Sequence, residues 1–584
     1  MARLDPHSYC DDAQPQTALL DWVARVDFGT RTLSATATLT FERAGSGPLD
    51  LDTRGLDITR VEALDGRAVP FVLHPEDAVL GARLALSLPD NTAGVRISYS
   101  TSPDASALQW LEPAQTHGGM HPYLFSQCQA IHARSVLPLQ DSPRVRLSYT
   151  ATLTVPASLK ALMAAAFVSR EVQGDVAVER WQMPQTIPPY LFAFAVGDLT
   201  SRDLGPRCRV WAEPGVIDRA AWEFDGADAM LTTAEALFGP YPWDRFDFLT
   251  MPPSFPYGGM ENPRLTFLTP TLLAGDRSLV NVLAHELAHS WTGNLVTNAN
   301  AEHFWLNEGF TVYAERRIQE VLDGPERGAL YEALGRESLD EAIEGFRDRP
   351  ALTHLRTKLQ GVDPDEAYSQ VPYEKGYLFL KTLERHVGRA AFDAYLRAYI
   401  HTFGFRSITT DDFVVFTRGA LPGALDAIDA DAWIDGPGVP PNAAPGGSAR
   451  LDALRALGTV PPSDALAATW SPAEWQLWLQ QCARSPEAVD CPALDARFHL
   501  SASTNAEILV AWLELAVLAG HTPGIERTRQ VLGQVGRMKY LRPLYKALMA
   551  RPETRAVARA TFEACAPAYH PIARQVVRGL LRAA

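Results

Sequence analysis

The stretch HELAHSWTGNLVTNANAEHFWLNEGF, residues 285–310, places two histidines and two glutamates close together in an otherwise apolar segment. His285 and His289 are four residues apart, so on an α-helix their imidazoles lie on one face and can bind the same metal ion. Eighteen residues, 290–307, separate His289 from Glu308, enough for the first helix to end and a second to begin beside it. The stretch therefore predicts a His, His, Glu ligand set.

Such a ligand set points to catalysis. Three protein ligands around zinc leave a fourth position for water, whose pKa the metal lowers to about 7. Glu286 follows the first ligand directly and is interpreted as the general base that takes a proton from the attacking water. The HExxH pattern alone also arises by chance on a solvated helix face, but Glu308 and its context favour one catalytic zinc ion. His303 is interpreted as a surface residue or a support for the ligands.

Apolar and polar residues alternate in the segments that lie toward the N-terminus. Residues 33–41 and 144–155 alternate strictly, which is the period of a half-buried strand. Short extended runs broken by Gly, Pro and Asp lie between and after them. Residues 1–200 are therefore predicted to form a mostly antiparallel β domain.

The periodicity changes to that of helices from about residue 218. Residues 218–239 predict a helix that ends at Gly239, and residues 244–251 predict a strand that leads into PYGGMENP. Asp276 or Ser278 is the expected N-cap of the helix that carries the two histidines, and Gly293 its expected C-cap. Helical signals continue to about residue 433, so residues 201–434 are predicted to be an α/β domain.

A linker and an all-helical domain are expected to follow. Residues 435–448 contain four prolines and four glycines, a composition typical of a semi-rigid linker. Residues 449–584 then show successive helix signals that favour a small α-solenoid. Two capping boxes are expected there, one formed by Ser471 with Glu474 and one by Thr504 with Glu507.

Composition narrows the classes of function. The 584-residue chain has a formal net charge of −15, which argues against a partner bound through its phosphates. No run of about 18 apolar residues predicts a membrane span, and the first residues show no apolar signal segment. Six scattered cysteines suit free thiols in a reducing compartment. We therefore expect a cytoplasmic protein without nucleic-acid or membrane partners. We also expect a monomer, because three packed domains can bury their own surfaces.

The motifs resemble those of a known family. HELAHSWTGNLVT, WLNEGF and the preceding GGMEN segment are similar to the zinc aminopeptidases of the aminopeptidase N type. Four longer segments resemble the leukotriene A4 hydrolase family and its bacterial aminopeptidase relatives: residues 125–143, 256–263, 363–377 and 535–546. The resemblance covers nearly the whole chain. It implies a multidomain α+β fold with an N-terminal β saddle, a thermolysin-like catalytic domain and a C-terminal helical domain, and an active site in the cleft between them.

The resemblance also assigns roles to individual residues. Glu261, with Gln129, would bind the free α-amine of a substrate, and Tyr373 would donate a hydrogen bond to the tetrahedral oxyanion. Arg537 and Lys539 would hold the substrate carboxylate, which suits di-, tri- and small oligopeptides. The remaining substrate-binding residues that it implies are Gln127, Gly258, Gly259, Met260, Asp365 and Tyr368. The two glycines would let an extended substrate backbone lie close to their strand.

The sequence thus predicts a zinc aminopeptidase that removes the first residue from short peptides. Asp365 and Tyr368 match positions that serve epoxide hydrolysis in the leukotriene A4 hydrolase family, so a second activity is permitted, and Asp365 is also implied to favour a basic first residue. Residues 450–530 match no motif, which leaves lipid substrates open. Two alternatives remain: an endopeptidase, which needs no amine anchor, and an inactive peptide-binding scaffold.

Overall fold

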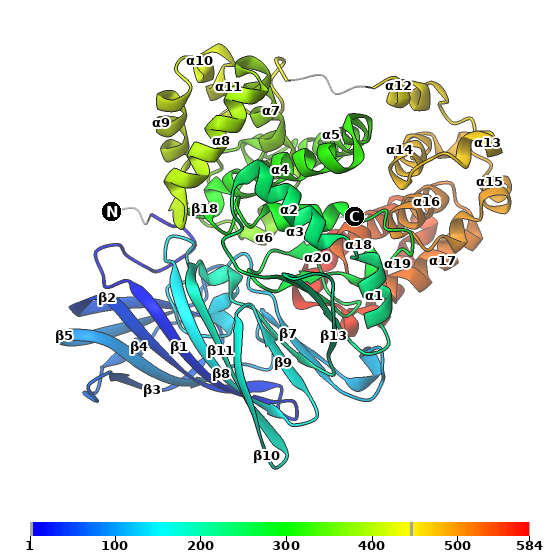
Figure 1. The fold of residues 1–584 in the computed structure, drawn as a ribbon. Helices are drawn as coiled ribbons and strands as arrows, with labels where there is room; N and C mark the ends of the chain where they lie inside the picture. Colours follow the sequence, from blue (N-terminus) through cyan, green and yellow to red (C-terminus); the bar gives the residue numbers. More distant parts are fainter. Residues whose placement is uncertain (1–3, 444–447, 583–584) are drawn as a thin grey trace.

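The structure is a computed structural model that describes residues 4–443 and 448–582. Figure 1 shows β-sheets at the N-terminal end, a mixed region of helices and strands above them, and a group of helices at the C-terminal end. This arrangement confirms the predicted multidomain α+β fold with a β saddle, a catalytic domain and a helical domain. Residues 444–447 of the predicted linker lie outside the described residues.

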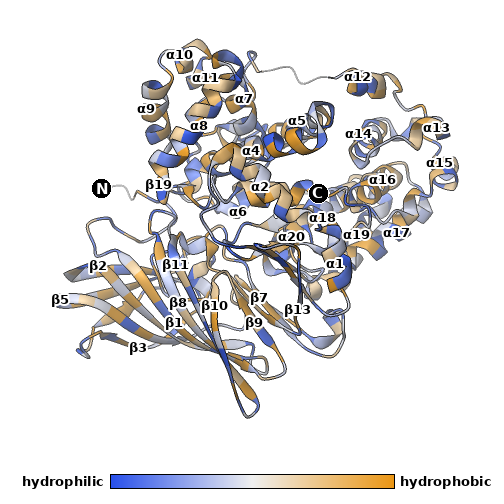
Figure 2. Cartoon of the chain, in the orientation of Figure 1, coloured by the Kyte–Doolittle hydropathy of each residue, from blue (hydrophilic) through white to orange (hydrophobic). Residues whose placement is uncertain are grey.

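The largest sheet has eight strands. Seven follow the order β10-β11-β8-β1-β2-β5-β3, and β4 pairs with β5. β1 runs parallel to β8, and the other pairings are antiparallel. The bounds are β1 (Thr17–Asp27), β2 (Thr32–Thr53), β3 (Asp57–Ala63), β4 (Phe71–Leu73), β5 (Ala82–Ser100), β8 (Leu147–Pro156), β10 (Ala166–Gln173) and β11 (Val176–Ile187). The strands expected at 33–41 and 144–155 are β2 and β8, and Figure 2 shows hydrophobic and hydrophilic residues alternating along the sheet.

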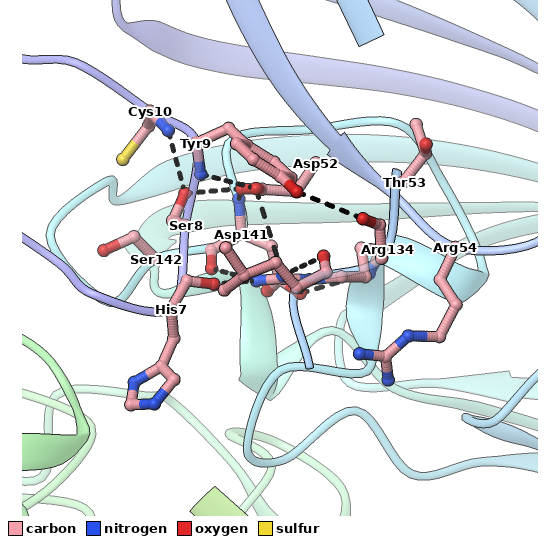
Figure 3. Close-up of polar contacts among 12 residues, drawn as sticks. His7, Ser8, Tyr9, Cys10, Asp52, Thr53, Arg54, Arg134, Asp141 and Ser142 are labelled. Carbon is pink, nitrogen blue, oxygen red and sulfur yellow. Dashed lines mark hydrogen bonds and ion pairs between the residues drawn. The ribbon is translucent and has the colours of Figure 1, made fainter. Parts of the chain in front are cut away.

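A smaller sheet and the N-terminal segment complete this domain. The second sheet has the order β6-β7-β12-β9 and comprises β6 (Leu108–Leu111), β7 (Tyr123–Ser126), β9 (Lys160–Met163) and β12 (Phe194–Gly197). Figure 3 shows the contacts by which the fully buried Arg134 holds the N-terminal segment against this domain. Its Nε donates to Asp141 Oδ2 at 2.9 Å, and its Nη2 donates to the carbonyl oxygen of His7 at 2.7 Å. Asp52 accepts from the backbone N–H of Tyr9 at 2.7 Å.

The central region contains a five-stranded sheet and eleven α-helices in the described part of the chain. The sheet order is β13-β14-β15-β17-β16, with bounds β13 (Thr200–Asp203), β14 (Cys208–Ala212), β15 (Phe246–Thr250), β16 (Gly259–Met260) and β17 (Thr266–Leu268). β18 (Val296–Asn298) pairs with β19 (Arg406–Ile408). The helices are α1 (Ile217–Glu223), α2 (Ala227–Phe238), α3 (Asn281–Ala288), α4 (Trp305–Asp323), α5 (Pro325–Gly345), α6 (Pro364–Ala367), α7 (Gly376–Val387), α8 (Arg389–Phe403), α9 (Thr410–Ala420), α10 (Ala424–Ala427) and α11 (Ala430–Ile434).

The strand expected at 244–251 is β15, but the single helix expected at 218–239 is wrong. That segment forms α1 and α2, because Gly226 adopts a φ of 98°, which no helix interior allows. The second helix ends before Gly239 as predicted.

The C-terminal helices stack in two layers. α14, α16, α18 and α20 pack side by side in succession, and α17 and α19 pack across them, which fits the expected solenoid-like arrangement. The bounds are α12 (Ala449–Ala456), α13 (Asp464–Ala467), α14 (Pro472–Ala483), α15 (Cys491–Phe498), α16 (Ala506–Leu518), α17 (Thr522–Leu532), α18 (Met538–Ala550), α19 (Arg555–Cys565) and α20 (Pro571–Arg582).

One of the two expected capping boxes is present. The backbone N–H of Ser471 donates to Glu474 at 2.8 Å, as predicted. The box of Thr504 with Glu507 is wrong: Asn505 caps α16 instead, because its side chain accepts from the backbone of the first turn. The Thr504 hydroxyl donates to the carbonyl oxygen of Ala274 in the catalytic region.

Two buried apolar clusters hold the molecule together. The first runs without a break from the β sheets into the central helices, and the second lies among the C-terminal helices and includes Leu330 and Ala333 of α5. The N-terminal and catalytic regions therefore share one continuous apolar core. All six cysteines are free thiols, as expected. Within residues 4–443 and 448–582, every helix is too short or too polar to cross a bilayer.

Candidate active site

The two histidines lie at the end of α3, and Glu308 lies in the first turn of α4. The expected helix ends are wrong. Val280 precedes the helix, because Asp276 accepts from the Ser278 backbone in a separate turn, and the helix stops at Ala288. The backbone N–H of His289 still donates to the carbonyl oxygen of His285 at 3.2 Å, so the last helical turn places both imidazoles on one face.

The three predicted ligands converge on one point. His285 Nε2 lies 3.1 Å from His289 Nε2, and Glu308 Oε2 lies 3.4 Å and 3.6 Å from these two nitrogens. Tetrahedral zinc with bonds of about 2.0–2.2 Å requires ligand atoms about 3.3 Å apart. Glu308 Oε2 is buried without a hydrogen-bond partner in the described chain, which is costly unless a cation balances it. The donor set therefore fits a zinc ion.

A second set of side chains orients these ligands and was not found from the sequence. Glu315 Oε2 lies 2.9 Å from His285 Nδ1, and Thr311 Oγ1 lies 3.1 Å from His289 Nδ1. Such contacts fix the tautomer and ring direction of metal-binding histidines. Both partners lie on α4 at three and seven residues after Glu308, the spacing of one helix face, and this pattern could have indicated them.

Several carboxylates crowd the same buried space. Burial raises the pKa of Glu286 to about 8; His285 opposes this shift and Glu308 adds to it. Burial, reinforced by Glu308 and Glu286, also raises the pKa of Glu261 well above its usual range. A dication bound beside these groups favours their charged forms. A bound dication would thus offset the negative charge of these carboxylates, in agreement with the spacing of the three predicted ligands.

The predicted amine-binding residues lie beside the ligands. Glu261 is buried, and its carboxylate receives a long contact of 3.5 Å from Gln129 Nε2. Gln127 turns elsewhere: its Nε2 donates to the sulfur of Met260 at 3.1 Å, and both side chains are buried. The structure therefore brings Glu261 and Gln129 together, whereas Gln127 contacts Met260 in β16.

The two glycines of the GGMEN segment lie against two side chains of the site, and their expected contact with a substrate backbone stays a prediction. A Cβ atom at Gly259 would lie 2.2 Å from Glu286 Oε1, and one at Gly258 would lie 2.6 Å from Arg537 Nη2. The side chains of Glu286 and Arg537 therefore occupy the space that a larger residue would fill. The absence of side chains at these two positions allows Glu286 and Arg537 to lie close to the strand.

Tyr373 lies on a π-helical turn, Val371–Lys375, immediately before α7. Its ring stacks at 6.1 Å from that of His285, and its hydroxyl donates to Tyr368 Oη at 3.1 Å. Burial raises the pKa of Tyr373 well above its usual range, so the hydroxyl keeps its proton at neutral pH. Arg316 of α4 binds Glu374 in the same turn, which fixes the turn against the ligand helix.

A largely apolar cavity begins beside the residues that are predicted to bind the amine. Gln129, Tyr257, Phe304 and Tyr368 line it, and Asp365 contributes a carboxylate. Asp365 accepts a hydrogen bond from His132 Nε2 at 2.9 Å, a contact that the sequence did not indicate. The second activity, epoxide hydrolysis, stays a prediction.

The two basic residues of the C-terminal domain meet one acidic residue. Lys539 Nζ donates to Glu507 Oε1 at 2.7 Å, and Arg537 Nη1 lies 3.6 Å from the same oxygen. Arg537 is buried beside Gly258, whereas the Lys539 side chain is half exposed. Glu507 balances one of the two positive charges, so the group retains one net positive charge near Gly258 and β16.

His303 is separate from the three ligands. Its Nδ1 lies 3.0 Å from Thr410 Oγ1, and burial lowers the pKa of His303 to about 4. The metal-binding groups in the described chain leave it out. It supports the start of α9.

Comparison with known proteins agrees with this geometry. Residues 16–191 match the Peptidase M1 N-terminal domain, residues 222–433 the Peptidase family M1 domain, and residues 470–581 the C-terminal domain of leukotriene A4 hydrolase. The chain is 37% identical to leukotriene A-4 hydrolase of Xenopus laevis, with 98% of each protein covered, and 37% identical to human aminopeptidase B, with 93% of this chain and 89% of the relative covered. The yeast LTA4 hydrolase complex with bestatin superposes with a TM-score of 0.90 at 32% identity, over 99% of this chain and 97% of that one. The chain therefore belongs to peptidase family M1, within the group that carries the leukotriene A4 hydrolase C-terminal domain.

Proposed function

We propose that this protein is a zinc aminopeptidase that removes the N-terminal residue from short peptides. One observation carries the proposal: three donor atoms, from His285, His289 and Glu308, lie 3.1–3.6 Å apart with a buried, unpartnered carboxylate oxygen among them. These residues would hold the zinc ion. When bound, zinc supplies a Lewis acid that acidifies water and polarises a carbonyl group.

Glu286 and Tyr373 have separate roles in the hydrolysis. The Glu286 carboxylate takes one proton from the attacking water and passes it to the nitrogen of the leaving amine as the peptide bond breaks. The Tyr373 hydroxyl donates a hydrogen bond to the oxyanion of the tetrahedral intermediate, a contribution of about 3 kcal/mol when the donor is fixed in place. The π-helical turn and the contact with Arg316 support such fixing.

Charge at the two ends of the site selects the substrate. Glu261, with Gln129, binds the ammonium group of a free N-terminus, which makes the enzyme an exopeptidase. Arg537 and Lys539 attract the carboxylate at the other end of a short peptide, in competition with Glu507. We infer a monomeric enzyme that acts in the cytoplasm, in keeping with its acidic composition and free thiols.

The test uses leucyl anilide with the purified full-length chain. We expect turnover that a zinc chelator abolishes and added zinc restores, and a loss of about a thousandfold in kcat for Glu286→Gln with zinc content retained. An N-acetylated tripeptide should be cleaved at least about a hundredfold more slowly than the free tripeptide, because the acetyl group removes the charge that Glu261 binds.

Two results would contradict the proposal. Turnover that survives complete removal of zinc would exclude the metal mechanism. Equal cleavage of the acetylated and the free peptide would instead identify an endopeptidase and remove the role proposed for Glu261.

A further inference from the structure

Lys375 is a fully buried lysine at the end of the π-helical turn that carries Tyr373. Its Nζ donates to two backbone carbonyl oxygens, that of Thr353 at 2.8 Å and that of Gly436 at 2.7 Å. These two residues are 22 and 61 positions away in the sequence. The amine therefore joins the turn to two distant segments of the catalytic region.

Burial of this amine is costly, and the protein offers it no direct counter-charge. In the part of the chain that the structure describes, no carboxylate forms an ion pair with Lys375. The carboxylate of Asp435 favours its charged form but pairs with Arg356 Nε at 3.1 Å. Burial outweighs Asp435 and lowers the pKa of Lys375 to about 7. The charged and the neutral amine each have at least two N–H groups, one for each carbonyl oxygen, so the two hydrogen bonds form in both protonation states.

Both carbonyl groups lie in segments that pair with each other. The backbone N–H of Leu355 donates to the carbonyl oxygen of Ile434 at 3.0 Å, and that of Gly438 donates to Thr353 Oγ1 at 2.9 Å. These hydrogen bonds join the two segments without any contribution from Lys375. We call the joined segments, residues 353–355 and 434–438, the anchor.

Three consecutive side chains of the turn have three different supports. The ring of Tyr373 stacks on that of His285. Glu374 binds Arg316 Nη2 of α4 through both carboxylate oxygens at 2.8 Å, and Lys375 binds the anchor. The turn that carries Tyr373 is thus fixed at two points, by the helix of the proposed ligand Glu308 and by the anchor.

We propose that Lys375 is a positioning residue that holds the Tyr373 hydroxyl in place for the oxyanion of the tetrahedral intermediate. The inference rests on the proposed aminopeptidase function and adds a residue that acts only through Tyr373. A donor stabilises an oxyanion most when it is fixed before the reaction, because reorientation during the reaction costs part of the gain. Without its two hydrogen bonds the end of the turn is free to leave the anchor, and Tyr373, two residues earlier, moves with it.

Two substitutions disturb this contact from opposite ends. Lys375→Met keeps a side chain of similar length but removes the donor. Gly436→Ala keeps the lysine: a Cβ atom at Gly436 would lie 2.4 Å from the carbonyl oxygen of Ala432, so the alanine must displace the segment that carries the acceptor. Lys381→Met is the control, because this lysine of α7 contacts Glu384 at 3.4 Å and not the anchor.

The readout is the division of the effect between kcat and KM for leucyl anilide. We expect kcat to fall about tenfold in Lys375→Met and about threefold in Gly436→Ala, with KM within about twofold of the parent protein. The loss lies in kcat because Tyr373 contacts an oxyanion that forms only on the way through the transition state. Lys381→Met should keep kcat within about twofold.

A comparison in the Tyr373→Phe background separates positioning from general support of the fold. Tyr373→Phe alone should lower kcat about a hundredfold. Addition of Lys375→Met to this variant should change kcat by less than about twofold, because the hydroxyl that the lysine positions is already absent. A contribution only to folding would lower kcat by the same factor in both backgrounds.

Equal factors in the two backgrounds would overturn the positioning role, and so would an unchanged kcat in Lys375→Met. If thermal unfolding shows that Lys375→Met does not fold, the same comparison with Gly436→Ala decides. Either failure leaves the chelator-sensitive cleavage of leucyl anilide by the parent protein intact, so it is distinct from failure of the proposed function. Absence of that cleavage in the parent protein would overturn the proposed function and this inference together.

Discussion

Glu315 holds the ring of His285 by a contact of 2.9 Å to Nδ1, and Gln319 in turn donates to Glu315 at 3.0 Å. Glu315→Gln should weaken zinc binding about ten- to a hundredfold, because an amide supports the imidazole less strongly than a carboxylate does. The zinc dissociation constant, measured by competition with a chromogenic chelator, checks this. Glu320→Gln is the matched control on the same helix, where the carboxylate binds Arg389 rather than a ligand. Equal zinc affinity in both variants would mean that Glu315 does not act through His285.

For individual residues, the sequence predicted contacts between positions that are close together in the chain. The spacing of His285, His289 and Glu308 indicated a ligand set because a helix turns every 3.6 residues, and the structure brings the three together. The pair of His132 with Asp365 joins residues 233 positions apart, and only the folded chain brings them together. The contact of Lys539 with Glu507, between two helices of the C-terminal domain, was missed for the same reason.

Helices α4 and α7 meet at two glycines, Gly309 and Gly376, and Gly309 directly follows the proposed ligand Glu308. A Cβ atom at Gly309 would lie 2.7 Å from the Cα of Gly376 and 3.1 Å from the carbonyl oxygen of Pro372. Gly309→Ala should therefore push the turn that carries Tyr373 away from Glu308, at a cost of about 1–3 kcal/mol in the free energy of unfolding. Thermal unfolding and kcat for leucyl anilide measure the two effects.

Gly328→Ala in α5 is the control for this crossing. A Cβ atom there meets nothing within 4 Å, so the substitution should raise stability by about 0.5–1 kcal/mol through helix propensity. A stabilised Gly309→Ala protein with an unchanged kcat would show that the close crossing is not needed.

Element types were predicted better than element ends. The alternation in β2 and β8 indicated strands because each buries one face, whereas the helix expected at 218–239 breaks at Gly226. The π-helical turn at Val371–Lys375 was not predicted, because its geometry follows from packing against α4 and α5 rather than from its own residues.

All three domains contribute residues to the site. Gln129 comes from the β domain, the proposed ligands come from α3 and α4, and Arg537 comes from the C-terminal domain. Domain order could be predicted because each domain carries its own motifs. The continuous core between the first two domains could not, since it depends on how their surfaces meet.

The C-terminal domain contacts the loop between β15 and β16 through two backbone hydrogen bonds. The N–H of Gly536 donates to Pro253 O at 2.7 Å, and the N–H of Met538 donates to Pro256 O at 2.8 Å, with Arg537 between them. A Cβ atom at Gly536 would lie 2.5 Å from the carbonyl oxygen of Ser254. Gly536→Ala must therefore displace this pairing and move the guanidinium away from Gly258.

Displacement of Arg537 should weaken the binding of substrates with a free carboxylate more than the binding of substrates that lack one. We expect the KM for trialanine to rise about tenfold in Gly536→Ala, whereas the KM for alanyl anilide, which lacks a carboxylate, should change less than about threefold. Gly533→Ala is the control in the same loop, because a Cβ atom there meets its nearest neighbour at an ordinary 3.4 Å. An equal change for both substrates would mean that the pairing holds the domains together but does not present Arg537 to a peptide carboxylate, and the inferred preference for short peptides would then need another cause.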